Sequence, residues 1–480
     1  MTTRLRMLAA TILLIGLGVR PASAQHSVAV VGATLIDGTG TPAVKDAVVV
    51  IEGKTIAAVG PRASVQIPPG ATIVNAAGKF IIPGLMDANV HLILNSSIEF
   101  LARYEGHFED LIEEAAQVTL RQGLTTVFDS WGPLQPLLNV REKIKRGDAI
   151  GSRMFVAGNI VGFSGPFGRD FNGAGGATAS KPFVKRINQV WEENTGPQLM
   201  WLTPEQLRPE IQKYIARGID FLKYGASGHR DEDFIMFSPA AQKVIIEECH
   251  RAGIIVQTHT TNNEALRLVL EAGVDMMQHG AKTGLVEMPD STIQLMLEKK
   301  VYCAVQPRTA ERLKIEVDEA AGDDRGKKEQ VRHANQVRLV KAHAPLLLAT
   351  DAGVMDPDSL EVMKPKMRID RLTELGEAHF VWFKAMAEKG MTPMEEIVSA
   401  TRNIAAAYHK LDQIGTLEKG KFADLVVLDA DPLADINNIR KISMVMKEGT
   451  VVDRDKLPTR RFLTAPRSAP AKTTSDGSKQ

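Results

Sequence analysis

Between residues 84 and 353 the sequence alternates short apolar runs with longer segments in which apolar residues recur at helical spacing. The eight runs are GLMDANVH (84–91), LTTVFDS (124–130), RMFVAGNIVG (153–162), DFLKYGAS (220–227), GIIVQTHT (253–260), VDMMQHG (274–280), VYCAVQP (301–307) and PLLLATDAG (345–353). Segments such as PEQLRPEIQKYIARG and SPAAQKVIIEECHRAG lie between them and carry the helical pattern. Strand–helix units repeated in this way favour an α/β fold with a parallel (β/α)₈ TIM-like barrel, which we predict over residues 83–409.

Both ends of the chain are rich in strand-like runs. Residues 28–82 contain short apolar stretches separated by Gly and Asp-Gly turns about every 8–12 residues, which is typical of a small β-sandwich. Matching pieces return in GTLEKGKFADLVVLD (415–429) and SMVMKEGTVVD (443–453). We therefore predict one discontinuous small β-sandwich domain, built from residues 25–82 and 410–460.

Two segments lack a regular pattern. The interval 162–200 contains the Gly-rich stretch GFSGPFGRDFNGAGGATAS, which we interpret as a structureless loop. A long loop inside a compact barrel is more often a lid or binding loop than a linker. The polar stretch RFLTAPRSAPAKTTSDGSKQ (461–480) predicts a disordered tail.

The N-terminus has the features of a secretory signal. A basic start, MTTRLR, precedes the apolar run MLAATILLIGLGV and the small-residue end Ala22-Ser23-Ala24. The apolar run is too short to cross a bilayer, which needs about 20 apolar residues, although an N-terminal membrane anchor is the alternative interpretation. We predict a signal peptide over residues 1–24, export to the periplasm or the exterior, and no membrane association after cleavage.

The overall charge is balanced, with 58 Lys and Arg residues against 57 Asp and Glu residues. Such a chain has no bulk electrostatic attraction for nucleic acid, so a small-molecule substrate is the better expectation. The only cysteines, Cys249 and Cys303, each lie in an apolar run, which favours two buried thiols over a bridge. We also expect the mature chain to form a homo-oligomer.

Polar residues stand at the ends of five of the predicted barrel strands, and the C-terminal ends of barrel strands meet at one face. They are Asn89, His91, Lys223, His259, His279 and Asp351. Taken singly, each has a structural interpretation, as a hydrogen-bonded core histidine, a helix cap or a solvent-facing lysine. Taken together, imidazoles and a carboxylate are ligands that Zn²⁺, Fe²⁺, Co²⁺ or Mn²⁺ accept. A lysine inside a barrel would otherwise be a costly buried ammonium, whereas its CO₂-derived carbamate can bridge two cations.

Several motifs resemble those of the amidohydrolase superfamily over nearly the whole mature chain. The motifs are FIIPGLMDA, GLTTVFDS, FLKYGASG, QTHTTNNEA, MMQHG, LLLATDAG, SATRNIAAAYHK and GTLEKGKFADLVVLDADP. The resemblance implies that His91 and Asp351 hold one metal ion, His259 and His279 hold another, and carboxylated Lys223 bridges them. The general body is also similar to the branch of Xaa-Pro dipeptidases and imidazolonepropionases.

Asn89 departs from the superfamily pattern, which has histidine at this position. An Asn-X-His subgroup includes molinate hydrolase and the phenylurea hydrolases, which cleave thiocarbamate or urea C–N linkages of apolar xenobiotics. An amide oxygen is neutral and a poorer donor than imidazole, so we expect the first metal position to be weak. The prediction is therefore one or two divalent ions, with zinc as the first candidate and Fe, Co or Mn as alternatives, together with the carbamate on Lys223.

The resemblance implies hydrolysis of an amide-like C–N bond, in an amide, carbamate or urea, of a small apolar or aryl substrate. In this hypothesis Asp351 is the catalytic general acid and base. The alternatives are a peptidase of the Xaa-Pro dipeptidase kind and a binding protein on a decayed barrel.

Further residues beside the predicted strand ends are candidates for substrate contact. Tyr224 and His229 follow Lys223 closely, and Arg308 at the end of the seventh run could meet a carboxylate; for each, a packing or surface role is the alternative. The interval 162–200 also supplies aromatic residues, which either line the pocket or only pack the loop. These residues are Phe163, Phe167, Phe171 and Trp191.

Overall fold

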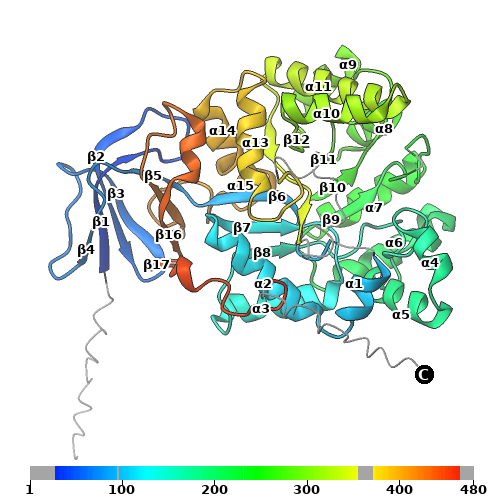
Figure 1. Cartoon of the computed structure of the whole chain (residues 1–480), viewed down its shortest axis with the longest axis horizontal. Helices are drawn as coiled ribbons and strands as arrows, with labels where there is room; N and C mark the ends of the chain where they lie inside the picture. The colour runs from blue at the N-terminus through cyan, green and yellow to red at the C-terminus, as the bar shows by residue number, and fades with distance from the viewer. Residues whose placement is uncertain (1–26, 95–96, 231, 355–370, 465–480) are drawn as a thin grey trace, which may run out of the picture.

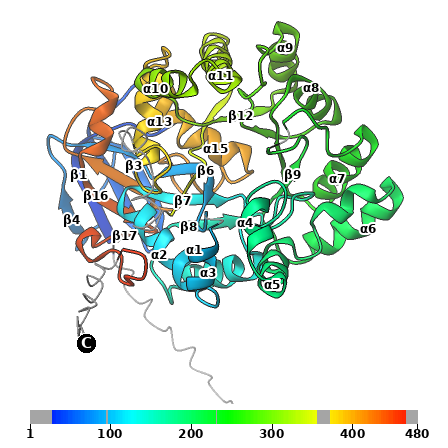
Figure 2. The same cartoon turned by 45° about the vertical axis from the view of Figure 1, so that its right-hand side comes forward.

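The computed structural model describes residues 27–94, 97–230, 232–354 and 371–464 (Figure 1). The predicted signal peptide and most of the predicted tail lie outside these residues. In both views a β-domain stands at one side of the barrel, and helices α6 (Pro204–Ile215), α7 (Pro239–Arg251) and α8 (Asn263–Ala272) lie at the far side (Figure 2).

The β-domain is formed by strands from both ends of the chain. Its sheet runs in the order β17-β16-β15-β5-β1-β2-β3, and β4 pairs with β1. The strands are β1 (Ser27–Leu35), β2 (Val44–Glu52), β3 (Thr55–Pro61), β4 (Thr72–Asn75), β5 (Phe80–Pro83), β15 (Leu425–Leu428), β16 (Ile442–Lys447) and β17 (Thr450–Val451). The antiparallel pair of β15 with β5 places Leu428 opposite Phe80 and so joins the two ends. Alternate residues of β1 and β2 enter two different apolar clusters, as expected for a sheet buried on both faces.

The barrel contains all eight predicted strands. They are β6 (Leu85–His91), β7 (Leu124–Asp129), β8 (Arg153–Val156), β9 (Leu222–Gly225), β10 (Val256–His259), β11 (Met276–Gln278), β12 (Tyr302–Val305) and β13 (Leu346–Leu348). Parallel pairing links β6, β7 and β8 in one group and β9 to β13 in another. A bridge between Val161 and Tyr224 connects the groups on one side, and the Asp351 N–H donates to the Asn89 carbonyl (2.8 Å) on the other. The predicted fold class is confirmed.

Helices follow the strands and cover the outside of the barrel. Besides α6 to α8 they include α1 (Ile98–Arg103), α2 (Phe108–Arg121), α3 (Leu134–Arg146), α9 (Asp290–Lys299), α10 (Ala310–Ala320), α11 (Asp324–Lys341), α13 (Ala378–Ala387), α14 (Pro393–Ser399) and α15 (Arg402–Ala407). Local signals set several starts: α6 and α14 both begin with a threonine capping box followed by proline, at Thr203 and Thr392. No helix among the described residues is long and apolar enough to cross a bilayer.

The interval 162–200 is more ordered than predicted. It contains α4 (Gly173–Thr178), α5 (Lys181–Glu192) and the 3₁₀ turn η1 (Pro197–Trp201). Glycine density suggested a loop, but Ile187 and Trp191, four residues apart on α5, bury an apolar face that stabilises the helix.

The first residues of the predicted tail, 461–464, are ordered in the structure. Glu114 accepts backbone N–H groups from Phe462 (2.5 Å), Leu463 (2.8 Å) and Thr464 (2.9 Å), and Leu463 is buried. Because one buried carboxylate satisfies three donors, the chain is ordered at least to residue 464. Cys249 and Cys303 are free and buried, as predicted.

Candidate active site

The six predicted ligand residues converge at the C-terminal end of the barrel. Asn89 and His91 lie in β6, Lys223 in β9 and His259 at the end of β10, while His279 directly follows β11 and Asp351 lies three residues beyond β13. The first five side chains are buried, and Asp351 is partly exposed. This face therefore collects polar groups that a barrel core would otherwise exclude.

Asp351 is the centre of the contacts. Its Oδ1 lies 2.9 Å from Asn89 Nδ2, 3.0 Å from His91 Nε2 and 3.9 Å from His279 Nε2. Burial raises the pKa of Asp351, but His279, His91 and Lys223 outweigh this effect and hold the pKa well below its usual value. Asp351 is therefore a carboxylate at neutral pH.

The carboxylate of Asp351 determines how Asn89 is oriented. An ionised carboxylate only accepts hydrogen bonds, so Asn89 must turn its amide nitrogen toward Asp351. The amide oxygen then accepts from the Ser130 hydroxyl, and Ser130 Oγ accepts from Lys223 Nζ at 3.0 Å. In the structure Asn89 is thus a hydrogen-bond donor to Asp351, and its role as a metal ligand stays a prediction.

The histidines have ring nitrogens free for a ligand. His259 Nε2, His91 Nδ1 and His279 Nδ1 are buried without a hydrogen-bond partner among the described residues. Burial holds the pKa of His259 and of His279 well below the usual value, so both rings are neutral. The two rings lie edge to face, with centroids 5.0 Å apart.

The donor chemistry fits a divalent ion, since neutral imidazole and carboxylate are its usual ligands. Within the described part of the chain, no group of three His, Cys, Asp or Glu side chains is arranged closely enough to hold a metal ion. The candidate donors instead approach one another in pairs. His91 with Asp351, and His259 with His279, are the two pairs. Lys223 lies near Asp351, which raises its pKa, but burial dominates and lowers the pKa to about 8.

Two of these residues have unusual backbone conformations. His279 and Asp351 both have φ of 58°, in the left-handed region that non-glycine residues rarely adopt. Such conformations cost of order 1 kcal/mol and persist where the surrounding structure requires them. Here they turn the chain beyond β11 and β13, and the side chains of His279 and Asp351 approach to 3.9 Å.

An aromatic wall, which we define as Trp131, Phe163, Phe171 and His229, borders the site next to β7, β8 and β9. Trp131 stacks on Phe171 with ring centroids 4.1 Å apart and meets His91 edge-on at 6.0 Å. Phe163 lies 5.3 Å from His259, and Phe171 lies 5.2 Å from His229. Of the four predicted loop aromatics, Phe163 and Phe171 therefore border the site. Trp191 and Phe167 instead pack behind them, against Phe108 and Phe183.

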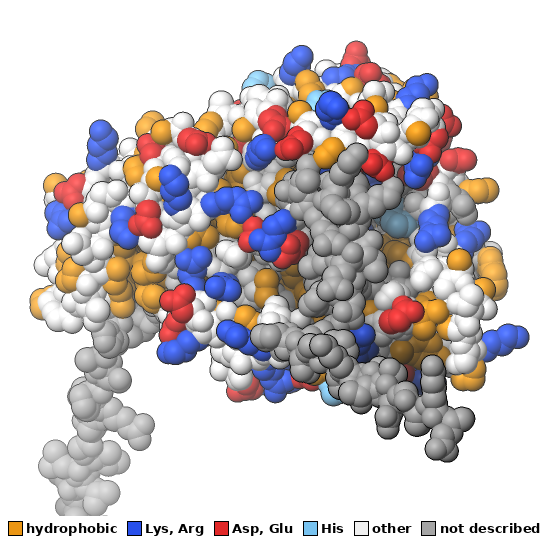
Figure 3. All heavy atoms as spheres, in the orientation of Figure 1, with side chains coloured by type: hydrophobic (Ala, Val, Ile, Leu, Met, Phe, Trp, Pro, Cys, Tyr) orange, Lys and Arg blue, Asp and Glu red, His pale blue; other side chains and the backbone are white. Residues whose placement is uncertain are grey.

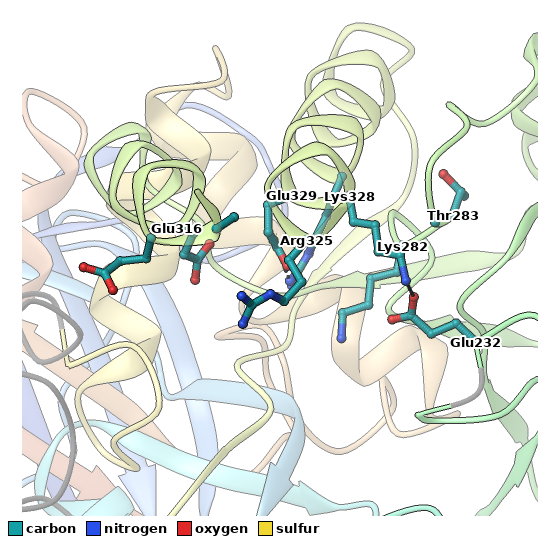
Figure 4. Close-up of a pocket in the computed structure, with 11 residues that line it drawn as sticks. Glu232, Lys282, Thr283, Glu316, Arg325, Lys328 and Glu329 are labelled. Atoms are coloured by element: carbon teal, nitrogen blue, oxygen red, sulfur yellow. Dashed lines mark hydrogen bonds and ion pairs between the residues drawn. The ribbon is translucent and has the colours of Figure 1, made fainter. Parts of the chain in front are cut away.

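A charged wall, which we define as Lys282, Arg308, Glu316, Glu329 and Arg332, borders the site next to β11 and β12. Arg308 pairs with Glu316 (2.7 Å) and Glu329 (3.0 Å), and Arg332 pairs with Glu329 (3.4 Å). Four of these residues, all but Arg308, line a pocket of about 490 Å³ beneath α10 and α11 (Figure 4). Burial, together with the charge of Arg332, lowers the pKa of Lys282 to about 8.

The charged wall is connected to Asp351 through Gln306. Gln306 Nε2 donates to Asp351 Oδ2, and Gln306 Oε1 accepts from Arg332 Nη2. Because arginine only donates, Arg332 fixes the orientation of the amide and keeps its NH₂ group toward Asp351. One oxygen of Asp351 is therefore bound by Gln306, and Oδ1 is left facing the histidines.

The structure separates the three candidate substrate contacts. Tyr224 is fully buried and its hydroxyl donates to Gln242 (3.0 Å), away from the site, because neighbouring strand residues point to opposite faces and Lys223 points inward. Arg308 is already paired with two carboxylates and so is not free to meet a substrate carboxylate. His229 lies at the mouth of the site, 5.3 Å from His259 between ring centroids.

Sequence reasoning missed Ser130, Trp131, Lys282, Gln306 and Arg332. The first four stand one to four residues beyond the ends of β7, β11 and β12. Ser130, Trp131 and Gln306 were overlooked because the search considered only histidine, lysine and acidic residues. Lys282 was overlooked because it lies four residues beyond its strand. Arg332 lies within α11, and no local pattern links it to a strand end.

Comparisons with known proteins agree with this site and fold. The model of the amidohydrolase family matches residues 80–452. The ochratoxinase of Aspergillus niger is 26% identical over 422 residues, which cover 84% of this chain and 81% of the relative. The solved structure of molinate hydrolase is 41% identical with a TM-score of 0.88 and covers 93% of this chain and 99% of that one. Phenylurea hydrolase B is 38% identical with a TM-score of 0.86, at 92% and 100% coverage. Because the family model spans the barrel together with strands β5 and β15 to β17 of the β-domain, the chain belongs to the amidohydrolase family.

Proposed function

We propose that the protein is a metal-dependent hydrolase that cleaves an amide-like C–N bond, in an amide, carbamate or urea, of a small substrate with an apolar or aryl group. The observation that carries the proposal is Asp351, an ionised carboxylate whose Oδ1 faces His91 and His279 while Gln306 binds Oδ2. The likeness to molinate hydrolase and phenylurea hydrolase B over almost their whole lengths supports the reaction class.

The residues that would hold a metal ion are His259 and His279, with Lys223 as a carbamate, and His91 with Asp351. When bound, a divalent ion supplies a Lewis acid and lowers the pKa of a water molecule toward 7. Asn89 keeps its nitrogen toward Asp351, so we propose that it positions the carboxylate instead of binding an ion.

Asp351 moves the proton in the proposed reaction. Its Oδ1 accepts a proton from the attacking water, whose oxygen forms a bond to the substrate carbonyl carbon. The C–N bond then breaks, and Asp351 passes the proton to the leaving nitrogen. The aromatic wall offers a stacking surface for an aryl group beside the scissile bond.

Substitution of Asp351 tests the proposal. In Asp351→Asn we expect kcat for aryl carbamates and anilides to fall by about 10²–10⁴-fold, because proton transfer is lost. Metal content must be measured on the same preparation, and near-normal turnover with the ions still bound would exclude this role for Asp351.

A substrate panel tests the reaction class. Aryl amides, ureas, carbamates and Xaa-Pro dipeptides are incubated with the enzyme, and amine release is measured. Cleavage of dipeptides alone would favour a peptidase. The solved structure of a Xaa-Pro dipeptidase is 19% identical to this chain, which supports only the shared fold.

A further inference from the structure

We propose that Lys282 anchors a carboxylate carried by the substrate, so that preferred substrates of the proposed hydrolase combine the scissile C–N bond with one anionic group. The inference rests on the proposed function for the reaction and on the charged wall for the anion. It assigns to Lys282 the contact that the sequence suggested for Arg308.

The position of Lys282 places it between the pocket and the reacting groups. Its backbone N–H donates to the His279 carbonyl (2.7 Å), directly beyond β11. In Figure 4 its side chain extends into the pocket, whereas the side chain of Lys328 turns to Glu232. Arg332 lines the same pocket and reaches Asp351 through Gln306, so the pocket lies close to the scissile-bond position.

Lys282 differs from the other cations of the pocket because its ammonium group has no partner within the described part of the chain. Lys328 pairs with Glu232 (2.6 Å), Arg325 with Asp323 (2.6 Å) and Arg332 with Glu329 (3.4 Å). By contrast, the ammonium group of Lys282 makes no hydrogen bond or ion pair with any residue that the structure describes. Lys282 is partly buried, and the carboxylates of Asp351 and Glu329 favour its charge without contacting it directly. A substrate anion in the pocket could make the direct contact that this ammonium group lacks.

The charge of the pocket limits the anion to a small one. Its lining contains four cationic side chains (Lys282, Arg325, Lys328 and Arg332) and four acidic ones (Glu232, Glu316, Glu319 and Glu329). A balanced lining in which one cation is unpaired among the described residues suits a monoanion such as a carboxylate, whereas the surrounding glutamates would repel a phosphate dianion more strongly. The volume of about 490 Å³ leaves room for a group larger than the reacting atoms.

Matched substrates test the proposal. N-phenylsuccinamate carries its carboxylate on the acyl side and 4-acetamidobenzoate carries it on the amine side. Their neutral counterparts are N-phenylbutanamide and 4-methylacetanilide, and released arylamine is measured with the metal-loaded enzyme. We expect kcat/KM for at least one carboxylate to exceed that of its neutral counterpart at least tenfold.

Variants assign the preference to Lys282. In Lys282→Met we expect the ratio of carboxylate to neutral kcat/KM to fall at least tenfold, while Lys282→Arg retains most of it. Lys328→Met is the matched control, because it removes a lysine of the same pocket that already has a partner, and it should keep the ratio. A wild-type enzyme that prefers the neutral substrates would overturn the proposal, as would a Lys282→Met variant that slows both members equally. The latter result would make Lys282 a stabiliser of the reacting oxyanion.

A binding measurement separates this proposal from the proposed reaction. The Kd of 4-methylbenzoate is measured by calorimetry for the metal-loaded wild type and for Lys282→Met, with no bond cleavage required. A Kd at least tenfold weaker in the variant supports the anchor even if no substrate of the panel is cleaved. Equal Kd values would overturn it whatever the enzyme hydrolyses.

Discussion

Burial lowers the pKa of two lysines at the barrel mouth to about 8, one beside the aromatic wall and one in the charged wall, yet the two lysines have different surroundings. Lys223, beside the aromatic wall, donates to Ser130 and lies within a chain of hydrogen bonds that ends at Asp351. Lys282, in the charged wall, has no partner among the described residues and faces an open pocket. We therefore expect Lys223 to react as a neutral amine and Lys282 to remain a cation, although the two pKa values are alike.

The walls also differ in what holds them together. Trp131 is fully buried and packed between rings, and its indole N–H donates to Asn159 (3.2 Å). The charged wall depends on two carboxylates that are shared among several arginines. Loss of one carboxylate therefore leaves more than one guanidinium incompletely paired, whereas loss of one ring leaves only a cavity. Away from the pocket, acidic and basic side chains are interspersed over the visible surface (Figure 3).

The largest effect is expected for Glu329→Gln in the charged wall. Glu329 pairs with both Arg308 and Arg332, whose side chains are almost fully buried, so the variant leaves two poorly compensated cations. We expect the free energy of unfolding in urea to fall by about 3 kcal/mol.

The matched control for Glu329→Gln is Glu287→Gln. Glu287 is 54% exposed and lies 3.5 Å from Arg338 at the surface, so its loss should change the free energy of unfolding by less than about 0.5 kcal/mol. Equal effects of the two variants would show that the charged wall is not held by its shared carboxylates.

The next effect concerns carbamate formation at Lys223. Only the neutral amine reacts with CO₂, and it releases a proton when the N–C bond forms. With a pKa of about 8, the neutral fraction rises from about 1% at pH 6 to about one half at pH 8. At fixed dissolved ¹³CO₂ we expect the initial rate of appearance of a carbamate signal by NMR to rise about 50-fold over this range.

The comparison of the two lysines makes the carbamate experiment selective. The signal should disappear in Lys223→Met and persist in Lys282→Met, although both amines have the same lowered pKa. A signal lost only in Lys282→Met would show that Lys282, and not Lys223, forms the carbamate.

A smaller effect is expected where the charged wall touches Asp351. In Arg332→Met the amide of Gln306 is no longer held in one orientation, so Asp351 Oδ2 loses a fixed donor. We expect kcat for a neutral anilide to fall about tenfold with little change in KM, which corresponds to about 1.4 kcal/mol.

A double-mutant cycle checks this route. Gln306→Met should give a similar loss, and the double variant should lose little more, because both changes remove the same contact with Asp351. Arg338→Met is the control on the same helix, since Arg338 pairs with Asp290 and Met288 away from the site. Additive losses in the double variant would mean that Arg332 does not act through Gln306.

Much of the fold, and the positions of several candidate site residues, could be predicted from the sequence because both depend on local patterns. The eight barrel strands follow from runs of apolar residues, and Lys223, His259 and His279 stand at the ends of such runs. Strand alternation alone would also have turned Tyr224 away from the site once Lys223 was placed inside.

The remaining features depend on contacts between distant segments. The orientation of Asn89 requires Ser130 and Asp351, which lie 41 and 262 residues away. Arg308 looked free because its partners Glu316 and Glu329 lie on α10 and α11 and contact it only in the folded barrel. Glycines in 162–200 concealed α5, whose stability comes from burial of Trp191 against Phe108 and Trp131.

The smallest effect is expected in the aromatic wall, for Phe171→Ala. Phe171 is half-buried and stacks on Trp131 at 4.1 Å, so its removal leaves the wall standing but deprives an aryl substrate of one ring contact. A ring contact contributes about 0.5–1.5 kcal/mol, so we expect KM for an anilide to rise about fivefold and KM for an aliphatic amide to change less than twofold. Phe183→Ala, which removes a ring packed on Phe167 behind the wall, is the control. If Phe171 and Lys282 bind opposite ends of one substrate, their losses multiply for an aryl substrate with a carboxylate, because the two side chains share no partner among the described residues. A double variant that loses no more than Lys282→Met alone would place the aryl group outside the aromatic wall.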